Sequence, residues 1–334
     1  MLLDGYQHEV HSHCETGSIL NVLRYNGIQL SEPMIFGIGS GISFVYLPFV
    51  KINHVPISAF RRLPGKIFSR VCKQLDIEFE LKTYSNPAKA MDELDRVLDK
   101  GIPANLQVGV YHLNYFPPEG RLHYNIHTMS VVGKENGDYL VSDSIFDGIQ
   151  KVPYEEMKRV RYAPGAFTPH GKMYWITKVP ENIDLHQPIV NGIKISVREM
   201  IGYYFWLIGT KGIRYFSDSF RKWPEKLGEK TSRQYLLQQI QMLEIAGTGG
   251  SGYRYIYGAF LKESAAILKQ DWINDVAVEM GQVGNRWREF SHIAAQYIKT
   301  RENFHNSFNE MADILLDISD KEHAIFYKLK KVSQ

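Results

Sequence analysis

The chain has 334 residues, of which 44% are apolar and 22% are charged, a composition typical of a soluble globular protein with room for two domains. Its formal net charge of +3 is too small to imply nucleic-acid binding by itself. No unbroken apolar run reaches the roughly 18 residues of a membrane span, and the first residues, MLLDGYQHEV, do not read as a signal peptide. We therefore expect a cytoplasmic protein that binds neither a membrane nor nucleic acid.

The two cysteines are Cys14 and Cys72. They could form one disulfide, but the lack of a secretion signal and the sparse cysteine count favour reduced thiols. The same count argues against a zinc site, and we expect neither a metal nor a cofactor. Cys72 lies on or beside the apolar face of a helix predicted over residues 60–75, which indicates core packing.

Cys14 stands immediately before the first predicted helix. Apolar residues recur at helical spacing from Ile19 to Leu23, and Gly27 ends the run. A thiol at a helix N-terminus faces unpaired backbone N–H groups and the positive end of the helix dipole, which stabilise a thiolate. Cys14 is therefore a candidate nucleophile. The alternative is that it is a small buried apolar residue.

A glycine-rich stretch follows, in which Gly37, Gly39 and Gly41 alternate with other residues. A dinucleotide-binding fingerprint follows a strand and opens a helix. This stretch instead follows a helix and leads into a strand predicted over residues 42–47. We interpret it as a loop that other segments approach closely.

The sheet is predicted to begin after a helix that ends at Gly101, with a strand over residues 102–113. Residues 126–144 are typical of a β-hairpin that turns at Asn136-Gly137. If the loop spans residues 133–137, His127 lies directly opposite Asp143. Directly opposed side chains are close enough for a carboxylate to hold an imidazole in one tautomer.

The second half of the chain changes character. A strand over residues 173–180 is followed by a predicted linker over residues 180–192, and from Ile195 onward the pattern is mostly helical. We predict an α+β first domain over residues 1–181 and a helical second domain over residues 182–334.

An early cysteine with a distant histidine and aspartate is the order of a papain-like thiol enzyme. Cys14 would attack a carbonyl, His127 would transfer protons, and Asp143 would orient the ring. The alternative is a buried polar pair with no catalytic role. The Cys14 N–H is one candidate oxyanion donor, and Gln7 or His8 is a candidate for the second.

A resemblance to a known family covers most of the chain. The run HCETGSILNVLRYNGIQLSEPMIFGIGSGISFVY resembles the N-terminal signature of the butirosin-biosynthesis protein H family (BtrH-like acyltransferases). GTGGSGYRYIYGAFLKESAAIL in the second half resembles the glycine-rich, arginine-aromatic motif of the helical domain that accompanies it. More distantly, HTMSVVGKENGDYLVSD is similar to bacteriocin-processing cysteine peptidases. Those peptidases place a glutamine six residues before the cysteine, whereas this chain has His8 there and the glutamine at Gln7.

The resemblance implies a papain-like fold and a cysteine acyltransferase in secondary-metabolite (antibiotic) biosynthesis. The thiol would take an acyl group from a phosphopantetheine thioester on an acyl carrier protein, and a small-molecule amine would remove it as an amide. From their positions we expect substrate-binding residues at Gln7, His8 and His13 near the thiol, and at Gly249, Gly250 and Arg254 in the second-half motif, where bare glycine backbone offers N–H donors. Alternatively, Arg254 is a structural salt-bridge partner beside a helix-helix turn.

An acidic carrier protein could meet six basic residues of the second half, although such a run can equally be a solvated face. They are Arg214, Arg221, Lys222, Lys226, Lys230 and Arg233. Two alternatives to the acyltransferase remain open: a peptidase or thioesterase that uses the same three residues, and a non-catalytic binding protein on this fold.

Overall fold

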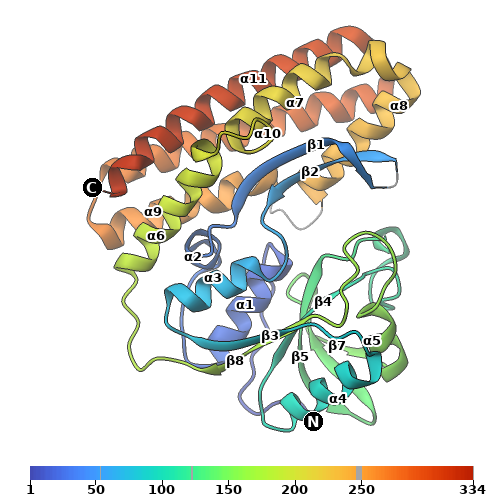
Figure 1. Ribbon diagram of the computed structural model, residues 1–334, viewed down its shortest axis with the longest axis vertical. Helices are drawn as coiled ribbons and strands as arrows, with labels where there is room; N and C mark the ends of the chain where they lie inside the picture. Colours follow the sequence, from blue (N-terminus) through green and yellow to red (C-terminus); the bar gives the residue numbers. More distant parts are fainter. Residues whose placement is uncertain (53, 122, 246–249, 334) are drawn as a thin grey trace. The chain divides into compact units, whose positions relative to one another are not determined.

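The computed structural model describes residues 1–52, 54–121, 123–245 and 250–333. Its contacts divide the chain into two units (Figure 1): unit 1 comprises Met1–Ile35 and Leu63–Asp184, and unit 2 comprises Phe36–Arg62 and Leu185–Gln334. Unit 1 contains a sheet with helices and unit 2 is mostly helical, which confirms the predicted α+β class. Within the described residues, no helix has both the length and the apolar character needed to cross a membrane.

Unit 1 is built on a six-stranded antiparallel sheet in the order β3-β8-β4-β5-β6-β7. The strands are β3 (Glu78–Lys82), β4 (Ala104–Val108), β5 (His127–Glu135), β6 (Asp138–Ser142), β7 (Ile149–Val152) and β8 (Met173–Lys178). The helices are α1 (Cys14–Tyr25), α3 (Lys66–Gln74), α4 (Pro87–Leu98) and α5 (Tyr154–Val160), and α2 (Glu32–Ile38) begins in this unit. Helix α1, which begins with Cys14, packs against β5.

The hairpin of β5 and β6 turns where the sequence predicts. Glu135 pairs with Asp138, so Asn136 and Gly137 alone form the loop. Their φ angles of 52° and 91° lie in the left-handed region that asparagine and glycine tolerate best.

The register of this hairpin differs from the prediction. The longer predicted loop would pair Val131 with residue 139, whereas Val131 pairs with Val141. A shift of two residues keeps each side chain on its own face of the sheet, because side chains alternate with a period of two. His127 and Asp143 therefore stay close enough to bond, although they are not directly opposed.

The glycine-rich stretch includes helix α2, which the sequence analysis did not predict. The expected close approach is found at Gly37, where a Cβ atom would lie 2.0 Å from the Phe260 ring. The carbonyl of Gly37 in turn lies 2.5 Å from where a Cβ of Gly192 would be. The glycines therefore serve packing inside unit 2.

Unit 2 joins one β-hairpin to a set of helices. The hairpin strands are β1 (Ile42–Ile52) and β2 (Val55–Arg61). The helices are α6 (His186–Val197), α7 (Gly209–Arg221), α8 (Trp223–Ile240), α9 (Arg254–Leu268), α10 (Trp272–Thr300) and α11 (Phe304–Leu329). Short 3₁₀ or π segments cover Pro118–Gly120 in unit 1 and Arg198–Gly202, Gln241–Ile245, Ser251–Tyr253 and Lys330–Ser333 in unit 2.

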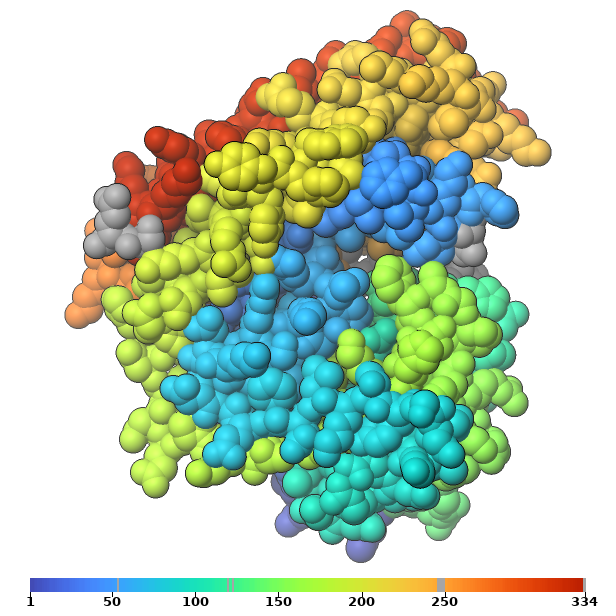
Figure 2. All heavy atoms as spheres, viewed as in Figure 1, coloured from blue at the N-terminus to red at the C-terminus, as the bar shows by residue number. Residues whose placement is uncertain are grey.

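The hairpin of unit 2 belongs, by sequence, to the half predicted as the first domain. Strand β1 packs on α7, and Figure 2 shows the blue atoms of the hairpin directly beside the yellow atoms of that helix. Phe44 of β1 lies among aromatic rings of the helices, with its centroid 6.0 Å from Phe216 and 6.1 Å from Trp287. Because of this aromatic packing, residues 36–62 belong to unit 2. The predicted boundary at residue 182 lies close to the second change of unit, between Asp184 and Leu185.

Two predicted elements have different limits. The helix predicted over residues 60–75 begins only at Lys66, because β2 takes the residues up to Arg61. The predicted linker over residues 180–192 already contains the start of α6 at His186. In both places the local sequence does not predict the element, because tertiary packing stabilises it.

Candidate active site

The thiol of Cys14 lies at the first residue of α1, where the sequence places it. The preceding residue, His13, caps the helix: its Nδ1 accepts a hydrogen bond from the N–H of Thr16. The Cys14 side chain is only 4% exposed. Among the described residues no acceptor takes the Cys14 N–H, so this donor is available at the start of the helix.

A buried carboxylate holds the segment that leads into this helix. Glu32 accepts hydrogen bonds from the backbone N–H groups of Ser12 and His13, at 3.0 and 2.9 Å, and from the hydroxyl of Thr16 at 2.8 Å. These bonds orient the turn before Cys14. The sequence analysis did not single out Glu32, because nothing local to residue 32 indicates that it meets a turn twenty residues earlier.

His127 and Asp143 form a buried pair. The Nε2 atom of His127 lies 2.7 Å from Oδ2 of Asp143, and the side chains are 4% and 0% exposed. The imidazole also interacts electrostatically with the Cys14 sulfur. Because Nε2 is engaged by Asp143, Nδ1 is the ring nitrogen left for the sulfur.

The electrostatics of this trio favour a charged imidazole. Burial disfavours the positive charge, but the Asp143 carboxylate and the Cys14 sulfur outweigh it and raise the pKa of His127 to about 10. The ring therefore carries its second proton at neutral pH. A protonated imidazole next to a thiol is the pairing that cysteine nucleophiles use for proton transfer.

Tyr115 is a further member of the site that the sequence analysis missed. Its hydroxyl donates to Oδ2 of Asp143 at 2.8 Å, the same oxygen that His127 contacts. Burial and the Asp143 carboxylate raise the pKa of Tyr115 well above its usual range, so it keeps the proton that it donates. The available signal was the aromatic, proline-containing loop that leads to His127. From that loop Phe116 also presents a ring edge to His127, at a centroid distance of 5.4 Å.

Ser144 joins the two halves of the site. Its hydroxyl donates to the Cys14 carbonyl at 3.3 Å, and its own carbonyl accepts from the N–H of His11 at 2.7 Å. A Cβ atom at Gly17 would lie 2.6 Å from the Ser144 oxygen and from Cβ of His11. Gly17 therefore permits the segment after Asp143 to lie tightly against α1.

Gln7, His8 and His13, which are also predicted near the thiol, differ in their exposure and in their hydrogen-bond partners. Both ring nitrogens of His8 are engaged, by the Ser142 hydroxyl at 2.8 Å and the Phe146 carbonyl at 2.9 Å, while Gln7 is exposed. The Nδ1 atom of His13 also lies 2.9 Å from the hydroxyl oxygen of Thr16. The second oxyanion donor stays a prediction, as do the substrate-binding roles of these three residues.

The comparisons with known proteins identify the family. Residues 13–144 match the family described as butirosin biosynthesis protein H, N-terminal, and residues 155–329 match one described as a domain of unknown function (DUF4872). The second match spans more than half of the chain, so the chain belongs to the DUF4872 family, and its N-terminal part is similar to butirosin biosynthesis protein H. This confirms the predicted resemblance, and with the site geometry it indicates a cysteine-dependent enzyme.

A solved structure is similar to part of this family member. It is described as a C39-like peptidase from Bacillus anthracis, with 15% sequence identity and a TM-score of 0.38. The similarity covers 54% of this chain and 98% of the peptidase chain. No curated protein matches the sequence.

The second-half motif of this butirosin biosynthesis protein H-like chain is built around a buried ion pair. Arg254 donates from Nε and Nη2 to the two carboxylate oxygens of Glu322, at 2.8 and 3.0 Å, and the Trp287 indole donates to the same carboxylate at 2.9 Å. Arg254 and Glu322 are fully buried. These contacts account for Arg254 without a ligand and agree with the structural alternative. Gly250, with φ of 85°, is described as buried, and Gly249 lies outside the described residues.

Proposed function

We propose that this protein is a cysteine-dependent acyltransferase that moves an acyl group from a phosphopantetheine thioester to an amine. The observation that carries the proposal is the buried Cys14, His127 and Asp143 set, in a chain whose N-terminal part is similar to butirosin biosynthesis protein H. The name of that N-terminal family refers to the biosynthesis of butirosin, which supports a biosynthetic role.

In the first half-reaction the Cys14 thiolate attacks the thioester carbonyl. The bond between the acyl carbon and the donor sulfur breaks, and the donor leaves as a thiol with the proton of His127. The exchange of one thioester for another is nearly isoenergetic, so no ATP is needed. Developing negative charge on the carbonyl oxygen would be met by the free Cys14 N–H.

In the second half-reaction an amine attacks the acyl-enzyme. The neutral His127 accepts the amine proton, a carbon–nitrogen bond forms, and the bond to the Cys14 sulfur breaks. Asp143 holds the ring orientation throughout and stabilises the imidazolium when it returns. The burial of Cys14 supports transfer over hydrolysis, because the acyl-enzyme must persist until the amine arrives.

The acyl donor in this proposal is an acyl carrier protein. Two of the six basic residues considered for its docking are already paired: Arg214 with Asp320 and Arg221 with Asp313. Those pairs are solvent-exposed, so they compete only weakly with an acidic partner. Carrier docking therefore stays part of the proposal.

The test is an intact-mass time course with an acyl N-acetylcysteamine thioester, comparing wild type with Cys14→Ala and Cys72→Ala. We expect acyl mass on wild type and on Cys72→Ala and none on Cys14→Ala. A panel of amines should then discharge the adduct faster than water does. Faster discharge by water would instead establish a hydrolase, and a Cys14 inert toward thioesters, amides and iodoacetamide would establish a non-catalytic binding protein.

A further inference from the structure

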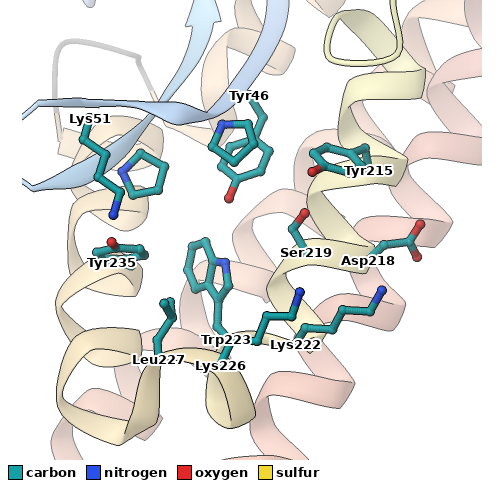
Figure 3. Close-up of a pocket in the computed structure, with 12 residues that line it drawn as sticks. Tyr46, Lys51, Tyr215, Asp218, Ser219, Lys222, Trp223, Lys226, Leu227 and Tyr235 are labelled. Atoms are coloured by element: carbon teal, nitrogen blue, oxygen red, sulfur yellow. The ribbon is translucent and has the colours of Figure 1, made fainter.

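A cavity of about 270 Å³ lies within unit 2, and all of its lining residues belong to that unit. The hairpin, the end of α7 and helix α8 on both sides of its break form the walls (Figure 3). Cys14, His127 and Asp143 are not among its lining residues. The cavity therefore calls for a function separate from the thiol chemistry.

The shape of the cavity depends on a break in helix α8. Gly228 has φ of 71° and ψ of 169°, which is not helical, and no atom crowds the position where its Cβ would be. The chain therefore changes direction there. Lys226 before the break and Tyr235 after it consequently line the same cavity.

Aromatic side chains line the interior. Tyr46, Trp223 and Tyr235 are at most 5% exposed. The Trp223 and Tyr235 rings meet edge to face at a centroid distance of 5.4 Å, and Tyr215 lies 6.0 Å from Tyr46. Rigid aromatic walls of this kind favour a flat ring or a short apolar group.

The lining residues also carry a surplus of positive charge. Lys51 comes from the hairpin, and Lys222 and Lys226 come from the start of α8, whereas Asp218 is the single acidic lining residue. The Lys51 ammonium lies 6.0 Å from the Tyr235 ring centroid, and Figure 3 shows it extending from the strand toward that ring.

These three lysines differ from the arginines on the neighbouring helix. Arg214 and Arg221 form ion pairs with carboxylates of α11. Among the described residues no carboxylate forms an ion pair with Lys51, Lys222 or Lys226. Lysines that line a cavity without ion-pair partners among the described residues favour an anionic ligand, and lysine is a common point-charge binder of phosphate.

We propose that this cavity binds a phosphorylated small molecule whose uncharged part is a flat ring. The phosphate pairs with lysines of the lining, and the ring lies against Trp223 and Tyr235. This proposal does not rest on the acyltransferase function, since it uses only the residues of the cavity.

The test is isothermal titration of the full chain with phenyl phosphate, inorganic phosphate and phenol at low salt. Phenyl phosphate carries both features, and each of the other two probes lacks one. We expect phenyl phosphate to bind at least about tenfold more tightly than either. Equal affinity for phenyl phosphate and inorganic phosphate, or no binding of either, would overturn the proposal.

A matched pair of variants locates the binding. Lys226→Ala removes a lysine of the cavity, and Lys230→Ala removes an exposed lysine of the same helix that does not line it. Both side chains are exposed, so neither change disturbs the core. We expect Lys226→Ala to weaken phenyl phosphate binding by about tenfold and Lys230→Ala by less than about twofold. Equal effects of the two variants would indicate attraction by overall charge and would refute the site.

Discussion

Two buried clusters, one in each unit, are each built around a carboxylate that accepts hydrogen bonds, but they differ in the side chain to which the carboxylate connects. In unit 1 the Asp143 carboxylate accepts from His127 and Tyr115, and the chain of contacts continues to the Cys14 thiol. In unit 2 the Glu322 carboxylate accepts from Arg254 and Trp287, and the cluster ends there. Burial and ion pairing alone therefore do not make an active site.

The difference lies in the residue at the end of each cluster. Arginine cannot give up its proton in a protein and indole is only a donor, so the Glu322 cluster has no group that can react. The Asp143 cluster ends in a sulfur that can form and break a covalent bond. The first cluster should consequently govern activity, and the second should govern stability.

The largest expected effect is on the rate of acylation. Asp143→Asn leaves His127 with the wrong tautomer, and we expect the acylation rate to fall by about 10³ to 10⁴. Intact-mass spectrometry under single-turnover conditions measures that rate. Asp320→Asn, the same change in an exposed surface pair, is the control and should leave it unaltered. A loss of less than about tenfold for Asp143→Asn would show that Asp143 is only a packing residue.

The second effect is on stability. Glu322→Gln leaves Arg254 as a buried charge without its counter-ion, and we expect the free energy of unfolding to drop by about 3 to 5 kcal/mol. Urea denaturation followed by far-UV circular dichroism measures it.

The double variant Arg254→Met/Glu322→Met removes both charges and should be considerably more stable than Glu322→Gln. Acylation by the folded fraction should be unchanged in each variant. A slower acylation rate per folded molecule would assign the Glu322 cluster to the chemistry and would break the distinction between the two clusters.

A third difference concerns pH. The folded pKa of His127, about 10, lies above the unfolded value of about 6.5. The protonated ring therefore stabilises the folded state fully below about pH 6.5, and this contribution is lost as the pH rises toward 10. Urea titrations at about pH 6 and pH 9.5 should show a larger loss of stability for wild type than for His127→Gln. Parallel losses in the two proteins would contradict the charged imidazole.

The smallest effect is expected at Tyr115. Tyr115→Phe removes one neutral donor from Asp143, worth about 0.5 to 1.5 kcal/mol, so the acylation rate should change by about two- to tenfold. Tyr111→Phe alters an exposed tyrosine of the same loop and is the matched control. A shift of the His127 titration midpoint in Tyr115→Phe, followed by NMR, separates positioning of the carboxylate from a loss of packing. An unshifted midpoint together with an unchanged rate would remove Tyr115 from the site.

The helix and the hairpin that carry the site could be predicted from the sequence, because they depend on neighbouring residues. The periodicity from Ile19 to Leu23 and the stop at Gly27 predicted α1, and Asn136-Gly137 predicted the hairpin turn. Cys72 was expected in the core and is fully buried, where burial raises the pKa of its thiol well above the usual range. Each of these inferences uses neighbours within about ten residues.

Contacts between segments that are distant in the sequence could not be predicted. Tyr115 meets Asp143 because of the path of a loop, and Arg254 meets Glu322 sixty-eight residues later. The hairpin register changed because a bulge and a short turn together determine the pairing. The sequence left the role of Arg254 open between ligand binding and an ion pair, and its partner became visible only in the structure.

The sequence by itself determined the chemical groups and the local elements: a thiol at the start of a helix, a histidine on a strand, an aspartate after the next strand, and the family to which they belong. The tertiary structure decided which groups meet, including the Tyr115 hydroxyl on Asp143 and the placement of residues 36–62 in unit 2. The physical reason is that backbone propensity and hydrophobic period act over a few residues, whereas burial, ion pairing and pKa shifts depend on segments that only the folded chain brings together.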